Sequence, residues 1–391
     1  VATAGGHAAL LRSADGGKTF SASLIPDGAG RSRSFDIEQF SGHNVPQAPP
    51  PIVRYTRTAG DPRLRWRQLN DLELFLPEKT DDGLSLGSPI LISKKCIGLS
   101  AHSGIPATVV SRGEKVHVAW AEATDPEVKV PGVPTYVATY DRQTKSLGEP
   151  ALVGYGAPPN DVHNSPSITI DSRGYLHVLA GTHGRPFQYA RSLKPNDAHS
   201  GWTEAVPVGE DLRQTYIGLV CGPDDTLYLV FRLWWYGAEP FPASHHATLA
   251  FQRKPPGETW QAPQVLIVPP FSEYSIFYHR LTIDRPDDIS FPETCVDRGR
   301  AVDHIAHLPS GLLGATGEEM EGEQQQQRHE EIGEGATEHH AELVARPGLP
   351  EGEGLDGRVD LVDVVHPGHL DVGAGGNRLE AVLGPAPVER E

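Results

Sequence analysis

The sequence has few cysteines and no long hydrophobic run. Its 391 residues include three cysteines, Cys96, Cys221 and Cys295, too few and too scattered for a disulfide framework. No apolar run approaches the roughly 20 residues of a membrane-spanning helix. The start, VATAGGHAALLRS, lacks the charged-then-apolar order of a secretory signal. These absences argue against a disulfide-stapled mini-protein and a helical membrane protein, and the strand-like start predicts that the chain is a fragment.

Positive charge is also scarce. The formal net charge is −17, and residues 301–391 contribute −14 of it, with 19 Asp and Glu against 5 Arg. About −3 remains for residues 1–300, which have no basic stripe of the kind that binds nucleic acid. All aromatic residues and all lysines lie before residue 301. The composition therefore predicts two parts, a folded part at residues 1–295 and an acidic Gly/Glu-rich tail at residues 296–391.

The tail has a composition typical of disorder, with many Gly and Glu residues and no strand periodicity. One interpretation is an acidic interaction tail. We favour another, an out-of-frame translation of a GC-rich gene, because the strand pattern that begins near Tyr274 stops abruptly.

Residues 100–270 contain a repeat of sheet-forming units. Segments 106–123, 166–183 and 217–234 each combine an apolar strand, a polar turn and an alternating strand. Aligned on His117, His177 and Tyr228, these units lie 60 and 51 residues apart. Four short strands per repeat at this period are typical of propeller blades. The sequence therefore predicts an all-β chain, an incomplete β-propeller of four-stranded antiparallel blades.

A shorter motif near the start supports this fold. RSADGGKTFS, residues 12–21, has the spacing Ser13-x-Asp15-x-Gly17-x-Thr19-Phe20 and resembles the Asp box of sialidase-like propellers. In such a hairpin turn the Asp caps backbone amides and the aromatic residue packs between strands. The motif is structural and indicates the fold rather than a function.

Three further stretches carry a family resemblance. HNSP and GYLHV within residues 163–179, YLVFR at 228–232 and FYHRLTID at 277–284 resemble the BNR-4 group of propeller proteins. That group includes ulvan lyases, and lyases or rhamnosidases that act on rhamnose–glucuronate linkages. The resemblance covers about residues 100–288 and implies a fold that has seven blades when complete. It also implies a secreted or periplasmic protein.

The resemblance implies a site built from two His, a Tyr and an Arg, which fall on His163, His183, Tyr216 and Arg232. A uronate lyase removes the proton at C5 of an acidic sugar and expels the group on C4. His163 and Tyr216 are expected to form the acid–base pair, since an imidazole and a phenol can exchange protons. His183 and a bidentate Arg232 are expected to stabilise the substrate carboxylate.

The order of these residues predicts their convergence. His163 precedes one strand of a hairpin and His183 follows its partner, while Tyr216 and Arg232 bracket the equivalent hairpin of the next unit. All four can therefore lie at one mouth of the propeller. Taken singly, each residue is more often an ordinary surface or strand-end residue, so the hypothesis depends on the set.

Other residues are candidates for contacts with an anionic polysaccharide. They are Asn164, Arg185, Trp234, Tyr274, Tyr278 and His102. Blade core is an equal alternative for Tyr274 and Tyr278. Of Trp234 and Trp235, one is expected to pack between blades and the other to face the sugar.

No organic cofactor is expected, because β-elimination needs none. His279 resembles a structural zinc ligand of the ulvan lyases, but only Cys295 lies at a compatible distance, and a zinc site needs three or four ligands. A structural zinc or calcium ion is therefore a hypothesis. No nucleic-acid or membrane partner is expected, and the sequence does not define an oligomeric state.

The predicted function is a polysaccharide lyase acting on ulvan or rhamnose–glucuronate linkages. The alternatives are an α-L-rhamnosidase of the same fold and a non-catalytic carbohydrate-binding propeller. The Asp box alone would favour a sialidase. This sequence, however, has no Arg-Ile-Pro-like opening motif to support that function.

Overall fold

The computed structural model describes residues 2–269, with gaps at 5–6, 14, 26–32, 59–68, 82, 100–106, 125–130, 158–160 and 243–244. The predicted tail from residue 296 lies outside the described residues, as do His102, Tyr274, Tyr278, His279 and Cys295. Within the described residues the chain is all-β apart from a short 3₁₀ turn. No described helix has the length and hydrophobicity needed to cross a bilayer.

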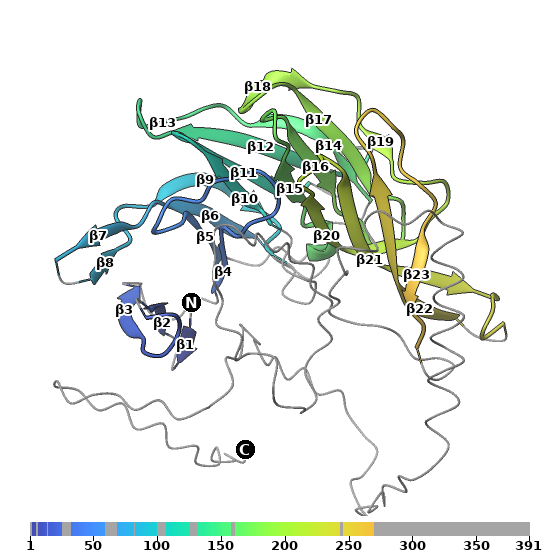
Figure 1. Cartoon of the computed structure of the whole chain (residues 1–391), viewed down its shortest axis with the longest axis horizontal. Coiled ribbons are helices and arrows are strands. Elements are labelled where there is room, and N and C mark those ends of the chain that lie inside the picture. The colour runs from blue at the N-terminus through green and yellow to red at the C-terminus, as the bar shows by residue number, and fades with distance from the viewer. Residues whose placement is uncertain are drawn as a thin grey trace, which may run out of the picture.

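Four antiparallel sheets follow one another along the chain and lie side by side in a fan (Figure 1). In each, the first three strands pair in chain order. The first sheet consists of β4 (Arg33–Ile37), β5 (Ile52–Arg57), β6 (Asn70–Phe75) and β9 (Ile90–Cys96). The second consists of β10 (Val109–Arg112), β11 (Lys115–Ala121), β12 (Val133–Asp141), β13 (Ser146–Leu147) and β14 (Ala151–Gly156).

The other two sheets repeat this plan. The third consists of β15 (Ser167–Ile170), β16 (Leu176–Ala180), β17 (Gln188–Lys194), β18 (Asp197–Trp202) and β19 (Val206–Pro207). The fourth consists of β20 (Gln214–Cys221), β21 (Leu227–Tyr236), β22 (His245–Lys254) and β23 (Gln264–Ile267). The first strands β10, β15 and β20 contact one another in turn, as the inner strands of propeller blades do. The four sheets are therefore successive blades, and the predicted fold class is confirmed.

The core lies between the blades. One apolar cluster joins the first blade to the second, through residues that include Tyr55, Leu74 and Trp120. A second joins the second and third blades, and a third joins the third and fourth blades. Along β11, Val118 belongs to the first cluster and the adjacent Ala119 to the second. Because both faces of a blade are buried, its strands need apolar residues at successive positions rather than at alternate ones.

Two smaller sheets lie at the N-terminal side. One contains β1 (Ala2–Ala4), β2 (His7–Arg12) and β3 (Ser21–Ile25), and the other is the hairpin of β7 (Glu78–Thr80) and β8 (Gly83–Ser85). The Asp box forms the turn between β2 and β3. Asp15 accepts hydrogen bonds from the Thr19 N–H at 2.9 Å and the Thr19 hydroxyl at 2.7 Å. Phe20 does not pack as expected and stays 42% exposed, because it lies beyond Arg12 and Ser21, the last paired residues of the hairpin.

The loop between β4 and β5 crosses the inner strands of the next three blades; its residues 38–45 are called the crossing segment. Glu38 is 5% exposed and accepts hydrogen bonds from the Ser111 N–H at 2.5 Å and the Ser111 hydroxyl at 2.6 Å, in the second blade. The Ser41 carbonyl accepts from the Thr169 hydroxyl of the third blade and the Cys221 N–H of the fourth, at 2.5 and 2.7 Å. The crossing segment thus bonds the first blade to three others through buried polar groups.

We expect Glu38→Ala to lower the free energy of unfolding by about 2 kcal/mol, because it leaves the Ser111 N–H and hydroxyl and the Asn44 amide without their buried acceptor. Burial raises the pKa of Glu38, although hydrogen bonds from Asn44 and Ser111 oppose the shift, so removing the carboxylate also relieves a desolvation cost. Denaturant unfolding measures the change. Glu78→Ala, on exposed β7, is the matched control, and equal stability of both variants would contradict the role of Glu38.

Candidate active site between the third and fourth blades

The two histidines of the candidate site lie at one end of the β15–β16 hairpin. His163 lies in a 3₁₀ turn at Val162–Asn164 before β15, and His183 follows β16. Asp161 caps this turn, and its carboxylate accepts from the His163 N–H at 3.0 Å. Gly181 allows the two ends of the hairpin to approach, since a Cβ there would lie 2.4 Å from the Ser165 carbonyl oxygen. The hairpin therefore brings His183 close to His163.

The tyrosine and arginine come from the neighbouring hairpin of the fourth blade. Tyr216 lies in β20 and Arg232 in β21, where Arg232 pairs with Thr215. The register of this pair shifts between Thr215 and Gly218, and Tyr216 has a φ of +64°. A bulge redirects a side chain out of the regular strand alternation, and a positive φ is strained for a residue with a Cβ. The backbone thus departs from regular β-structure at the residue that turns toward His163.

A single buried carboxylate holds both imidazoles. Asp161 is 1% exposed. One of its oxygens lies 2.5 Å from His163 Nδ1 and the other 2.9 Å from His183 Nδ1. The imidazole rings stack with their centroids 4.2 Å apart. Because a carboxylate can only accept, both Nδ1 atoms carry the hydrogen, and each neutral ring keeps the lone pair on Nε2.

His163 Nε2 faces the phenol of Tyr216. The Tyr216 hydroxyl lies 3.3 Å from it and donates, since Nε2 of the neutral ring is an acceptor. The Arg232 guanidinium lies over the Tyr216 ring, 4.2 Å from its centroid, and 4.7 Å from the Trp234 ring centroid. The four predicted residues, His163, His183, Tyr216 and Arg232, therefore converge. Asp161, which was not predicted, contacts both histidines.

The environment sets the charges of this group. Burial raises the pKa of Asp161, but hydrogen bonds from His163 and His183 outweigh burial, and the pKa lies well below its usual range. Burial lowers the pKa of His163, and its hydrogen bond with Asp161 only partly offsets this, so the pKa lies below 6.5. At neutral pH the group therefore consists of a carboxylate and a neutral His163, which is the form able to take up a proton.

Two of the predicted substrate contacts differ from expectation. Arg232 is 3% exposed and stacks between two aromatic rings, because β21 is buried on both faces and holds this side chain inside the blade. It therefore does not present a bidentate fork to the mouth. Asn164 is 1% exposed, and its amide donates to the Asp161 carbonyl at 3.1 Å. It fixes the turn that carries His163 rather than facing a substrate.

The remaining described candidates lie at the edge of the group. Arg185 is exposed and follows His183 by two residues. Trp234 is half-buried beside Arg232, whereas the Trp235 indole donates to the Thr248 hydroxyl at 2.8 Å and packs on the core between the third and fourth blades. The tryptophan that packs between blades is therefore Trp235, and contact of Trp234 with a sugar stays a prediction.

Sequence reasoning missed Asp161, although it holds both imidazoles. The available signal was the Asp-x-His spacing of residues 161–163, which also fits an ordinary N-cap. Asp161, His163 and His183 could also hold a metal ion. However, their atoms lie 2.5 and 2.9 Å apart, closer than the roughly 3.3 Å between two tetrahedral zinc ligands. These separations fit shared protons better than a shared metal.

Comparison with known proteins agrees with the sequence motifs. Residues 110–240 match the model of a family described as BNR repeat-containing. No curated protein matches the chain. Three solved structures illustrate the similarity to known folds. A PL25 ulvan lyase bound to -[GlcA(1-4)Rha3S]- is 19% identical with a TM-score of 0.34, and covers 44% of this chain and 40% of its own.

The second is the polysaccharide lyase Uly1, at 14% identity and a TM-score of 0.30, covering 46% of this chain and 45% of its own. The third is the mannosyltransferase MPT-1 of Leishmania mexicana, at 9% identity and a TM-score of 0.30. It covers 60% of this chain and 69% of its own. The chain thus spans less than half the length of the lyases it matches. Residues 110–240, which include the candidate site, match the BNR repeat-containing family that the motifs indicated.

Proposed function

We propose that this chain carries the site of a polysaccharide lyase that cleaves a uronate-containing polymer by β-elimination. The observation that carries the proposal is the contact chain from the Asp161 carboxylate through His163 to the Tyr216 phenol. It combines an oriented, neutral imidazole with a phenol at 3.3 Å. Such a pair supplies both a base and an acid at neutral pH.

The elimination needs one proton removed and one supplied. The base takes the hydrogen from C5, and the electron pair of the C5–H bond forms the C4–C5 double bond. The C4–O bond breaks, and its electrons leave with the oxygen, which takes a proton from the acid. Within the His163–Tyr216 pair one member accepts the first proton and the other provides the second. The hydrogen bond between them lets a proton pass across and restore the pair.

Asp161 is a positioning residue in this scheme. By accepting from Nδ1 it fixes the His163 tautomer that has a lone pair on Nε2, and it orients the ring toward Tyr216. It does the same for His183, whose side chain is 30% exposed. The Nε2 lone pair lets the neutral His183 ring accept a hydrogen bond from a sugar hydroxyl. The exposed Arg185 is the group that can donate to a substrate carboxylate.

Arg232 acts through charge rather than direct contact. Its guanidinium lies 4.2 Å from the centre of the Tyr216 ring, where a positive charge favours the phenolate over the phenol. It also opposes protonation of His163. A buried cation in this position stabilises the negative charge that develops beside it during the elimination.

The substrate class comes from the resemblance of the motifs to the ulvan and rhamnose–glucuronate enzymes. An anionic polysaccharide also suits the site edge, where the cationic Arg185 is accessible. Trp234 adds an aromatic surface of the kind that stacks on sugar rings.

Incubating the full chain with ulvan or a rhamnose–glucuronate polymer should produce absorbance at about 235 nm, from the unsaturated uronate. We expect His163→Gln and Tyr216→Phe each to lower kcat by roughly 10²–10⁴-fold, because each removes a proton-transfer group. Matched controls are His199→Gln on the exposed part of β18 and Tyr175→Phe at the opposite end of the β15–β16 hairpin, both expected to keep full activity.

Other outcomes separate the alternatives. New reducing ends without the absorbance would replace the lyase by a hydrolase of the rhamnosidase type. Binding of the polymer without turnover would indicate a carbohydrate-binding propeller.

The pH dependence should change in Asp161→Asn. In the wild type, activity falls at acid pH as His163 becomes protonated, with an apparent pKa below 6.5. Asp161 raises the pKa of His163, so its neutralisation should move this acid limb to lower pH. At the same time kcat should fall by roughly 10²–10⁴-fold, because the tautomer is no longer fixed. Asp81→Asn, on an exposed turn, is the control. An acid limb that stays in place would rule out Asp161 as the partner of His163.

A further inference from the structure

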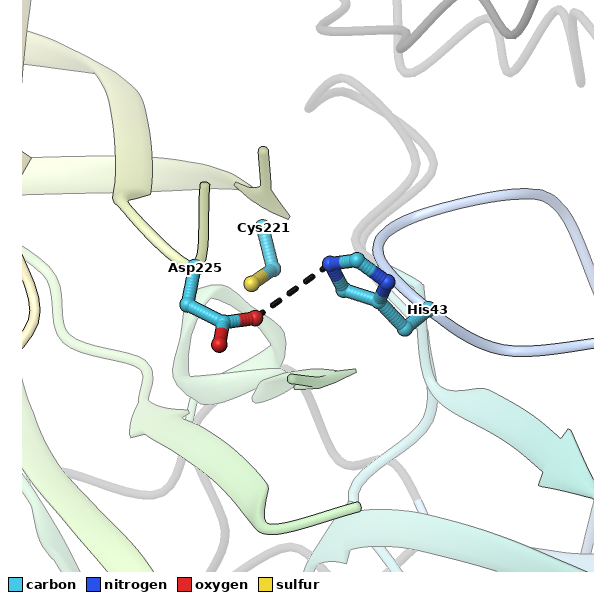
Figure 2. A group of neighbouring side chains, drawn as sticks. All are labelled: His43, Cys221 and Asp225. Carbon is cyan, nitrogen blue, oxygen red and sulfur yellow. Dashed lines mark ion pairs between the residues drawn. The ribbon is translucent and has the colours of Figure 1, made fainter. Parts of the chain in front are cut away.

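A second group of potential ligand atoms lies at the other end of β20, away from Tyr216. It consists of His43 from the crossing segment, Cys221 at the end of β20 and Asp225 in the turn before β21. Figure 2 shows the three side chains converging from the two parts of the chain. Tyr216 and Cys221 are five residues apart in the sequence, which corresponds to roughly 16 Å along a strand. The group is therefore separate from the candidate active site.

The geometry of this group suits a tetrahedral metal ion. His43 Nε2 lies 3.3 Å from an Asp225 carboxylate oxygen. Two nitrogen or oxygen ligands of a tetrahedral zinc ion lie roughly 3.3–3.6 Å apart. Cys221 Sγ completes the set, and all three ligand atoms lie within 4.8 Å of one another. The His43 and Asp225 side chains are 23% and 18% exposed, so the site is open to a water.

Neighbouring groups hold the carboxylate in place. Asp225 accepts from the Ser172 N–H at 2.7 Å and from the Ser172 hydroxyl at 2.6 Å, one bond to each oxygen. Ordered hydrogen bonds of this kind orient metal ligands in proteins. Cys221 is 1% exposed and carries a thiol rather than a disulfide. The site thus joins a buried sulfur to two accessible ligands.

We infer that His43, Cys221 and Asp225 bind a divalent transition metal of the zinc class, with water in the fourth position. A nitrogen, sulfur and oxygen set fits zinc and excludes magnesium and calcium, which take oxygen ligands. Binding deprotonates the Cys221 thiol and breaks the 3.1 Å contact of His43 Nε2 with the Gly222 carbonyl. The ion fastens the crossing segment to the fourth blade, at the far end of a strand that also carries Tyr216.

Cobalt tests this site on the full chain, because Co²⁺ replaces Zn²⁺ in tetrahedral sites and gives an intense near-ultraviolet band when bound to thiolate. We expect the apo protein to bind a single Co²⁺ with this band and to release it to Zn²⁺. Cys221→Ser should abolish the band. His43→Gln and Asp225→Asn should weaken Co²⁺ binding by at least about 100-fold, since each leaves only two protein ligands. Zn²⁺ should raise the Tm of the wild type but not of His43→Gln.

Control variants separate this site from the other candidates. Cys96→Ser and Cys295→Ser keep the three ligands and should keep the band, and Asp161→Asn should leave Co²⁺ binding unchanged. His43→Gln replaces a partly exposed loop residue, so its result does not depend on the fate of the buried Cys221 variant. Absence of a thiolate band in the wild type, or its loss in Cys295→Ser or Asp161→Asn alone, would overturn the inference. Neither result depends on lyase activity.

Discussion

The Asp161 carboxylate is the group on which the arrangement of the candidate site depends. It is buried in a turn between two blades, and burial alone would favour its neutral form. Two imidazole N–H groups reverse this preference. Because one carboxylate serves both rings, the position and tautomer of His163 and His183 are fixed together. The contact of His163 with Tyr216 then extends this order into the next blade, so packing between the blades and the chemistry of the site are linked.

The blade repeat was the most predictable part of the fold. His117, His177 and Tyr228, the residues that align the three predicted units, pair with Val110, Thr169 and Val220 in equivalent hairpins. Their spacing is visible because both strands of each hairpin are apolar and short turns join them. The blade of β4, β5, β6 and β9 was not predicted as a unit. Its strands are separated by long connections, including the crossing segment, so no fixed period marks it.

The site was predictable in its members but not in all their roles. Chain order places His163, His183, Tyr216 and Arg232 at one end of two neighbouring hairpins, and the structure brings them together. The burial of each side chain could not be inferred from the order of the residues in the chain. Arg232 was expected at the mouth, but β21 is covered on both faces, so its guanidinium stacks on Tyr216 instead. Asp161 was missed because an Asp two residues before a His is also an ordinary turn residue. Its contact with His183 spans 22 residues.

Two groups that contain His and Asp residues lie near opposite ends of β20. The distances between their nitrogen and oxygen atoms indicate different chemistry in each group. In one, nitrogen and oxygen atoms approach to 2.5 and 2.9 Å, separations typical of short hydrogen bonds. In the other, His43 and Asp225 stay 3.3 Å apart beside a sulfur, a separation that leaves room for an ion. The same strand thus positions a proton-transfer pair at one end and a proposed metal site at the other. Because the crossing segment bonds to the Cys221 N–H as well as providing His43, fixing it also restrains the strand that holds Tyr216.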